Sequence, residues 1–258
     1  MILRRENIGH DLDEVAATLR HREILLNKPF LYKLYTSWYR GFIHHIPEDV
    51  QGQCLEIGSG GGFLKDLYPD IITSDIQAIP GCDRMFAAEE LPFEPGSLKA
   101  IFMLNALHHI PDTESFLTKA EQALAPGGIL YMVEPAVTPF SKWVYTRFHH
   151  EPFDVHAQQW SFPATGPMSG ANDALPWIIF TRDRDRFLKL FPHLVVERIR
   201  LHTPFRYLLS GGFSYKSLLP GWAFGPVSVG EACLRPLFAW LALFQVIVVR
   251  KKITDGRK

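Results

Sequence analysis

The sequence predicts an α/β protein with a doubly wound, mostly parallel sheet. Short apolar runs alternate with stretches of helical periodicity between residues 53 and 133, and the first run ends in a glycine-rich turn. Strands that are joined by helices run parallel, are covered on both faces and bind ligands at their carboxyl ends. A chain of 258 residues is long enough for one such domain with insertions.

The predicted elements follow in order. Apolar periodicity over residues 11–46, interrupted at 27–29, indicates two helices that form an N-terminal helical cap within residues 1–50. In the core, residues 51–135, strands are expected at 53–57, 71–75, 99–104 and 129–133, with a short one before residue 89. Helices are expected at 63–68 and 113–124.

Residues 136–190 break this rhythm, and we expect an insertion or lid there, because long aperiodic segments of compact domains usually serve binding. Residues 191–258 are expected to complete the sheet with strands at 194–201 and 244–249. The apolar stretch 204–247 carries few Lys or Arg residues, whereas a helix lying on a membrane is rich in them. A core or dimer surface is therefore the favoured interpretation of that stretch.

The composition excludes several classes of protein. Basic and acidic residues balance at 27 each, so we expect no nucleic-acid partner. Three scattered cysteines indicate a reducing, cytoplasmic location. The longest apolar run, residues 237–249, is shorter than the roughly 20 residues of a transmembrane helix, and the first residues do not resemble a signal peptide. The sequence leaves peripheral membrane contact and homo-oligomerisation open.

The glycine-rich turn follows the first apolar run and Glu56. It reads Gly-Ser-Gly-Gly-Gly from residue 58 to residue 62. Glycine permits positive φ and lets a ligand approach the main chain, so the turn is typical of ligand binding. A nicotinamide-binding Rossmann turn has a third glycine where this chain has Phe63. That fingerprint is therefore incomplete.

Four further segments add to the turn. Asp75 ends the second apolar strand 17 residues after Gly58, where a carboxylate can accept both hydroxyls of a ribose. Residues 87–93 read AAEELPF, residues 102–112 read FMLNALHHIPD, and residues 124–130 read LAPGGIL. In this order the segments resemble the motifs of class I S-adenosylmethionine-dependent methyltransferases, specifically those similar to methyltransferase type 11. The resemblance covers residues 54–134, about a third of the chain.

The resemblance implies a seven-stranded Rossmann-like methyltransferase fold, with the N-terminal helical cap and an insertion after strand five. It also implies that S-adenosylmethionine is the cofactor and that its methyl group passes to an oxygen, nitrogen or carbon nucleophile of a small-molecule acceptor. By resemblance, the methionine part lies at Glu56 and Asn105, the ribose at Asp75, and the adenine at Ala88 and Glu89. The backbone floor is made by Gly58, Ser59, Gly60 and Gly62.

The candidate catalytic residues are His149, His150 and Glu151 of the insertion. Imidazoles beside a carboxylate can take a proton from an acceptor as the methyl group arrives. A metal could also bind at His149, Glu151, Asp154 and His156, but no helical His pair or Cys fixes a geometry, so we predict no metal site.

The pair His108-His109 follows the strand at 99–104. It could supply a base, but the resemblance favours a structural role in the turn, with one imidazole capping a helix and the other packed. Two other functions stay open at this point: a nicotinamide-dependent oxidoreductase, and a methyltransferase-like module that binds without catalysis.

Overall fold

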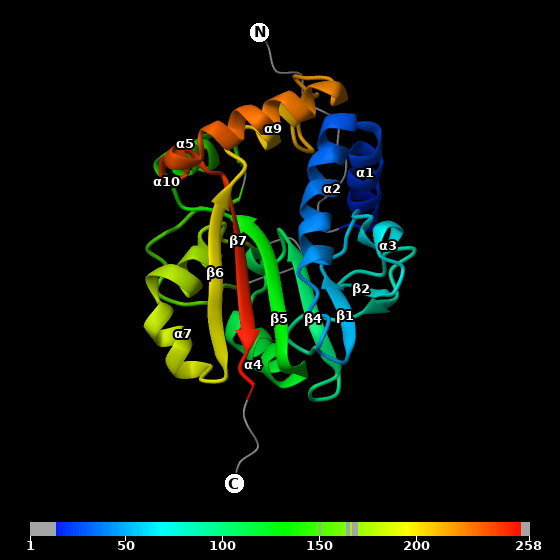
Figure 1. Ribbon diagram of the computed structural model, residues 1–258, viewed down its shortest axis with the longest axis vertical. Helices are drawn as coiled ribbons and strands as arrows, with labels where there is room; N and C mark the ends of the chain where they lie inside the picture. Colours follow the sequence, from blue (N-terminus) through cyan, green and yellow to red (C-terminus); the bar gives the residue numbers. More distant parts are fainter. Residues whose placement is uncertain (1–13, 150, 164–165, 167–169, 254–258) are drawn as a thin grey trace.

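The computed structural model describes residues 14–149, 151–163, 166 and 170–253. Its centre is a seven-stranded sheet in the order β3-β2-β1-β4-β5-β7-β6 (Figure 1). β7 is antiparallel to both of its neighbours, and the other pairs are parallel. The predicted fold class is therefore confirmed. The strands are β1 (Gln53–Ile57), β2 (Ile71–Asp75), β3 (Arg84–Met85), β4 (Leu98–Leu104), β5 (Leu124–Pro135), β6 (Leu194–His202) and β7 (Phe244–Lys251).

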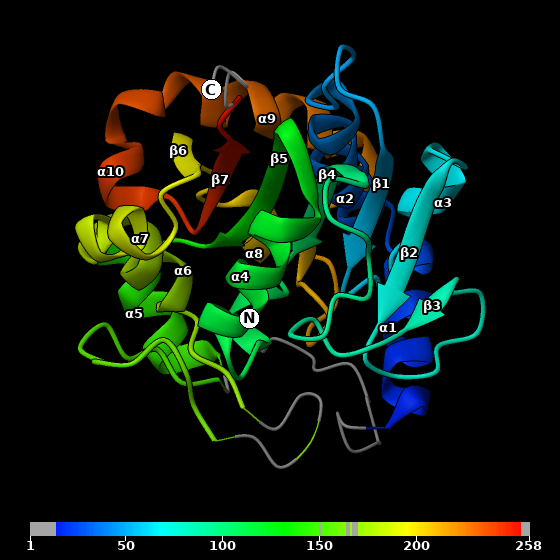
Figure 2. The same cartoon turned by 90° about the horizontal axis from the view of Figure 1, so that it is seen from below.

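Helices cover both faces of this sheet, and α4, α6 and α7 lie together along one side of it (Figure 2). The helices in the described part of the chain are α1 (Val15–Asn27), α2 (Pro29–His44), α3 (Leu64–Leu67), α4 (Thr113–Ala123), α5 (Pro139–Phe148), α6 (Leu175–Trp177), α7 (Arg184–Leu190), α8 (Arg206–Ser210), α9 (Phe224–Cys233) and α10 (Phe238–Leu241). Single turns are η1 (Leu107–His109), η2 (Ile178–Arg182), η3 (Gly221–Ala223) and η4 (Arg235–Leu237). None of these helices combines the length and apolarity that crossing a bilayer requires.

Two hydrophobic cores follow from the alternation of side chains along the strands. Ile101 of β4 faces the core shared with α4 and α7, whereas its neighbours Ala100 and Phe102 face the core shared with α2. Phe42 of α2 stacks on Phe102 with ring centroids 4.9 Å apart. The predicted N-terminal helices are confirmed, with Pro29 starting α2 directly after α1 ends.

One predicted strand boundary was wrong. β5 begins at Leu124, so Pro126, Gly127 and Gly128 lie inside the strand, where a register shift against β4 absorbs them and Gly127 takes φ +82°. Within the predicted insertion, where the sequence predicted no helix, α5 forms. Its start signals are Thr138, which caps the helix reciprocally with Ser141, and Pro139 at the first helical position.

The segment between β6 and β7 forms α8 to α10, and α9 runs across one end of the sheet near α2 and α5 (Figure 1). Its exposed side chains include Trp222, 75% accessible, and Trp240, 64% accessible. A core role is therefore wrong for these two side chains. Tyr207 and Phe213, by contrast, turn inward and line a cavity.

Candidate active site

A cavity of about 340 Å³ opens at the carboxyl ends of the parallel strands. The last residues of β1, β2, β4 and β5 all line it, namely Ile57, Asp75, Leu104 and Pro135. Ligands of open α/β sheets bind at this edge because the loops that leave the strands gather there. Its other walls come from the glycine turn, from η1 and the insertion, and from aromatic residues of α2, α5 and α8.

The glycine turn is shaped for close approach to its backbone. Gly58 and Gly60 adopt φ of +68° and +46°, which side chains disfavour. A Cβ atom on Gly58 would lie 2.8 Å from the Cβ of Ala106, and one on Gly62 would lie 2.8 Å from the carbonyl oxygen of Ser59. Phe63, at the position of the missing third glycine, is buried and stacks on Tyr32. The turn therefore fits a ligand that needs main-chain contact.

The Asp75 carboxylate lies at the cavity wall beside this turn. It accepts hydrogen bonds from the backbone N–H of Gly60 at 2.9 Å and of Gln77 at 3.0 Å. Burial raises the pKa of Asp75, and these amide donors oppose the rise. A carboxylate has about four acceptor positions, so lone pairs remain for further donors.

Glu56 is buried beneath the turn and is not among the described residues that line the cavity. Burial raises its pKa to about 8, opposed by a hydrogen bond with Ser59. Its Oε2 atom has no hydrogen-bond partner in the described structure. An orphaned carboxyl oxygen at this place fits a cationic group bound on the turn, because burying a charge without a partner is costly.

The other sequence-predicted cofactor residues reach the same cavity. Ser59, Ala88, Glu89 and Asn105 all line it. Asn105 follows β4 with φ +52°, a conformation that is uncommon outside glycine but that Asn tolerates best. All predicted cofactor residues except Glu56 thus line the same cavity.

His108 is fixed by a buried carboxylate. Its Nδ1 lies 2.6 Å from Oε2 of Glu134, the penultimate residue of β5. The other oxygen of Glu134 accepts the backbone N–H of Ala106 at 3.0 Å and of Leu107 at 2.8 Å. Because the carboxylate accepts, Nδ1 of His108 donates, and the ring presents Nε2 to the cavity.

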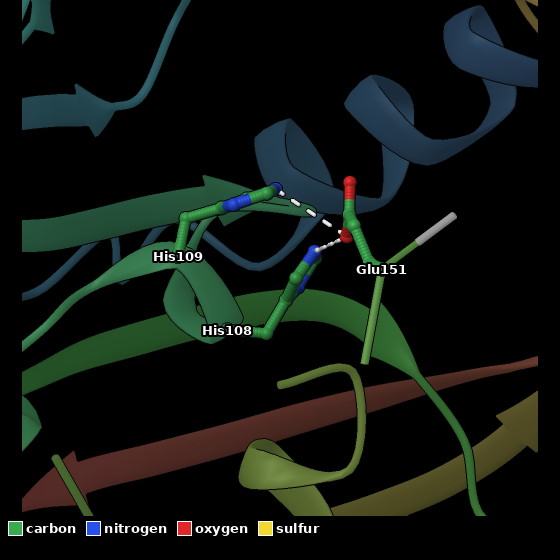
Figure 3. Close-up of side chains that lie close together, drawn as sticks. All are labelled: His108, His109 and Glu151. Carbon is green, nitrogen blue, oxygen red and sulfur yellow. Dashed lines mark ion pairs between the residues drawn. The ribbon is translucent and has the colours of Figure 1, made fainter. Parts of the chain in front are cut away.

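Glu151 is the meeting point of three imidazoles. Its Oε2 lies 3.4 Å from Nε2 of His108, 3.7 Å from Nε2 of His109 and 3.9 Å from Nδ1 of His149. Both η1 imidazoles point toward this oxygen (Figure 3). Asp173 joins them, 3.1 Å from Nδ1 of His149 and 3.5 Å from Nε2 of His108. We call these five residues the His/carboxylate cluster.

The charges of the cluster shift one another. Burial by itself lowers the pKa of His108, but the carboxylates of Glu134, Glu151 and Asp173 raise it well above its usual value. Burial lowers the pKa of His109 to about 4, helped by the neighbouring His108. Burial would raise the pKa of Glu151, yet the surrounding imidazoles hold it well below its usual value.

The structure brings together more of this cluster than the sequence did. His149 and Glu151 of the predicted catalytic set line the cavity, whereas His150 lies outside the described residues. Asp173 was missed because it lies 22 residues beyond Glu151 in a segment without periodicity. Glu134 could have been found as an acidic residue that closes a buried strand.

The η1 histidines also differ from the prediction. Neither imidazole caps the following helix, because Asp112 is the N-cap of α4 and accepts the backbone N–H of Ser115 at 3.1 Å. His108 is packed against Glu134, as a structural role requires, but both His108 and His109 also line the cavity.

Comparison with known proteins finds a matching domain family and similar folds. The model of a methyltransferase domain family matches residues 55–132. The fold is similar to geranyl diphosphate C-methyltransferase from Streptomyces coelicolor A3(2), solved with Mg²⁺, geranyl diphosphate and S-adenosyl-L-homocysteine. That chain is 13% identical, with 95% of this chain and 86% of that chain covered and a TM-score of 0.54. Another geranyl diphosphate methyltransferase, in complex with GPP and sinefungin, is 14% identical, with 86% and 80% covered and a TM-score of 0.52.

No curated protein matches the sequence. At these identities the structural likeness concerns the fold, and the family match concerns the segment that carries the glycine turn, Asp75 and the η1 histidines. The family match favours a methyl-donor cofactor over the nicotinamide alternative. Residues 55–132 therefore match the methyltransferase domain family, and they lie in a fold similar to that of methyltransferases solved with S-adenosyl-L-homocysteine or sinefungin.

Proposed function

We propose that the enzyme methylates a neutral, partly apolar small molecule that enters the cavity beside the His/carboxylate cluster. One observation carries this proposal: the predicted cofactor residues other than Glu56 line the same cavity of about 340 Å³ as the cluster. A methyl donor on the glycine turn and an acceptor at Glu151 would thus share one enclosed space. Alignment and exclusion of water account for much of the rate in such a displacement.

The cofactor is assigned to the glycine-turn side of the cavity. Gly58, Ser59, Gly60 and Gly62 offer their backbone, Asp75 accepts the ribose hydroxyls, and Ala88 and Glu89 border the adenine. Asn105 and the buried Glu56 lie at the methionine end. When bound, S-adenosylmethionine supplies an electrophilic methyl group on a positively charged sulfur.

The acceptor side has a different character. Tyr35, Tyr145, Tyr207, Phe213 and Phe244 give it aromatic walls, and its polar groups are those of the cluster. No Lys or Arg occurs among the described residues that line the cavity, so the diphosphate acceptor of the similar structures would meet no ammonium or guanidinium group here. An acceptor with an apolar or aromatic skeleton and one nucleophilic oxygen or nitrogen matches this wall.

Glu151 and the imidazoles around it contact and polarise that nucleophile in this proposal. His108 and His109 lie in η1, which follows β4, and Glu151 lies in the insertion, so the strand edge and the insertion supply the cluster together. Incubating the enzyme with labelled cofactor and a cell extract, followed by mass spectrometry of methylated products, tests the acceptor class. A methylated protein or nucleic acid as the main product would contradict the proposal.

Cofactor binding gives a first prediction. Asp75→Ala should weaken S-adenosylmethionine binding by at least about tenfold, roughly 1.4 kcal/mol, because charge-assisted hydrogen bonds to the ribose are lost. Calorimetric titration of both proteins measures this, with NAD(H) as a ligand that should not bind. Asp154→Asn, an exposed carboxylate elsewhere in the chain, is the matched control and should leave the dissociation constant unchanged. Equal affinity of the wild type and Asp75→Ala would show that the ribose does not bind at this residue.

Glu56 gives a second prediction, on pH. With a pKa of about 8, Glu56 is mostly protonated at pH 6. A cationic ligand favours the ionised form, so binding should release a proton, and affinity should rise with pH up to about 8 and level off above it. We expect the dissociation constant to be about tenfold weaker at pH 6 than at pH 8. Calorimetry in buffers of different ionisation enthalpy reports the released proton, and Glu56→Gln should abolish both effects.

A further inference from the structure

The His/carboxylate cluster gathers five side chains around the carboxylate of Glu151. The distances that join Glu151 and Asp173 to the nearest imidazole nitrogens run from 3.1 to 3.9 Å. Two overlapping groups share Glu151: one with His108 and His109, the other with His149 and Asp173. Within each group the ligand atoms lie within 4.8 Å of one another.

These separations are close to those found around a bound metal ion. Nitrogen and oxygen ligands sit about 2.0 to 2.2 Å from a divalent transition metal, so neighbouring ligands of one ion are about 3 to 3.5 Å apart. Hydrogen-bonded imidazole and carboxylate groups, in contrast, are usually about 2.7 to 2.9 Å apart. Four of these five distances exceed 3.3 Å, which suits ligands held around an ion better than direct ion pairs.

The rings of η1 are also held as metal ligands usually are. A ligating histidine commonly donates its second ring N–H to a carboxylate or a backbone carbonyl, which fixes the ring and leaves the other nitrogen for the metal. His108 donates Nδ1–H to Glu134 at 2.6 Å. His109 has Nδ1 3.4 Å from the carbonyl oxygen of Gly170. Both rings consequently offer Nε2 to Glu151.

Charge supplies an independent argument. The side chains of Glu134 and Asp173 are 0% and 1% exposed, and that of Glu151 is 13% exposed. Three carboxylates in so small a buried volume are costly unless cations neutralise them. Neither oxygen of Asp173 has a hydrogen-bond partner within the described structure, although both oxygens approach imidazoles. A divalent ion would satisfy these oxygens together.

We propose that the His/carboxylate cluster binds one divalent transition metal ion, of the Zn²⁺, Mn²⁺, Fe²⁺ or Co²⁺ class. Mixed imidazole and carboxylate ligands suit these ions, whereas Mg²⁺ and Ca²⁺ prefer oxygen alone. Binding of the ion is a property of the cluster by itself. Its role rests on the proposed function: the ion holds an oxygen of the acceptor beside the methyl donor. The sequence-based prediction of no metal site is thereby replaced.

The test is titration of chelator-treated protein with Co²⁺, followed by displacement with Zn²⁺. Bound Co²⁺ reports its ligands through visible absorption, and calorimetry gives stoichiometry and affinity. We expect one ion per chain, with Co²⁺ and Zn²⁺ at least tenfold tighter than Mg²⁺. Glu151→Gln should weaken binding by about 100-fold or more, since it removes the ligand that both groups share.

Two further variants make the result specific. Glu134→Gln leaves all five side chains of the cluster intact, but its amide N–H₂ cannot accept a hydrogen bond from Nδ1 of His108. The ring should then carry its proton on Nε2, which leaves no lone pair there for the ion. Metal binding should weaken by roughly 10- to 100-fold. His156→Gln is the matched control, because this exposed imidazole of the same segment lies outside both groups, and its affinity should equal that of the wild type. Thermal unfolding and S-adenosylmethionine affinity verify that each variant is folded.

The possible results separate the metal site from the methyl transfer. Absence of Co²⁺ absorption, equal affinity for Mg²⁺, or a loss of binding in His156→Gln but not in Glu134→Gln would each overturn the metal site. In any of these cases the cluster would be a hydrogen-bonded network without a metal ion, and methyl transfer would remain open to test. Tight metal binding without consumption of any methyl acceptor would instead retain the site and contradict the proposed function.

Discussion

Replacing Glu151 by glutamine is expected to lower kcat for methyl transfer by about 100-fold or more, which is at least roughly 2.7 kcal/mol. Glutamine keeps the size of the side chain but removes the negative charge toward which His108, His109 and His149 converge. Whether that carboxylate acts on the acceptor directly or through an ion, the nucleophile loses its activating group. Single-turnover measurement of methyl transfer separates this loss from slow product release.

The same experiment has a sharp internal control. Glu151 lies outside the set of residues assigned to the cofactor, so the affinity for S-adenosylmethionine should stay within about twofold of wild type. Asp154→Asn, three positions along the same segment and exposed, should retain full kcat. A Glu151→Gln enzyme that turns over at the wild-type rate would show that alignment of the reactants is sufficient and that the cluster has no part in catalysis.

Loss of stability on acidification is the second large effect, and it arises at His202. Burial lowers the pKa of this imidazole to about 3, assisted by Arg200 and Arg206. Its Nδ1 lies 2.7 Å from the hydroxyl of Thr203, and Nε2 has no hydrogen-bond partner in the described structure. The folded protein therefore holds His202 neutral in an apolar setting between Trp38 and Phe244.

The unfolded chain takes up a proton at His202 near pH 6.5, whereas the folded protein does so only near pH 3. The contribution of His202 to the free energy of unfolding is fully present above pH 6.5 and is lost as the pH falls toward 3. We expect about 2 kcal/mol of loss between pH 7 and pH 5. Urea unfolding at both values measures it. His202→Asn keeps a partner for Thr203 but does not titrate, so it should lose about 2 kcal/mol less over the same range. Parallel losses in the two proteins would assign the acid sensitivity to other groups.

The cofactor half of the site could be predicted from the sequence because it is local. Between Gly58 and Gly62 the chain turns within five residues, and positive φ leaves few alternatives to glycine. Asp75 and Asn105 each end or follow a strand, and parallel strands end at one edge of a sheet. Spacing along the chain therefore translated directly into position in space.

The two N-terminal helices could also be predicted from the sequence. Apolar residues at helical spacing, with Pro29 restarting the pattern, gave both α1 and α2. α5 was missed because its start signals, Thr138 and Pro139, were read as part of the break in periodicity. The strand extension through Pro126, Gly127 and Gly128 was missed because those residues normally end elements. In that strand the register shift against β4 overrides the local preference.

By itself, the sequence predicted the α/β fold and a methyl-donor site at the glycine turn, because those features depend on short-range patterns. Only the tertiary structure decided which side chains share the cavity with that turn. η1, the insertion and β5 bring His108, Glu151, Asp173 and Glu134 together from positions far apart in the chain. No spacing rule encodes that convergence, because it depends on how the insertion folds back over the strand ends. Its physical consequence is a buried cluster of charged side chains in the cavity. The proposal about the acceptor rests on that cluster.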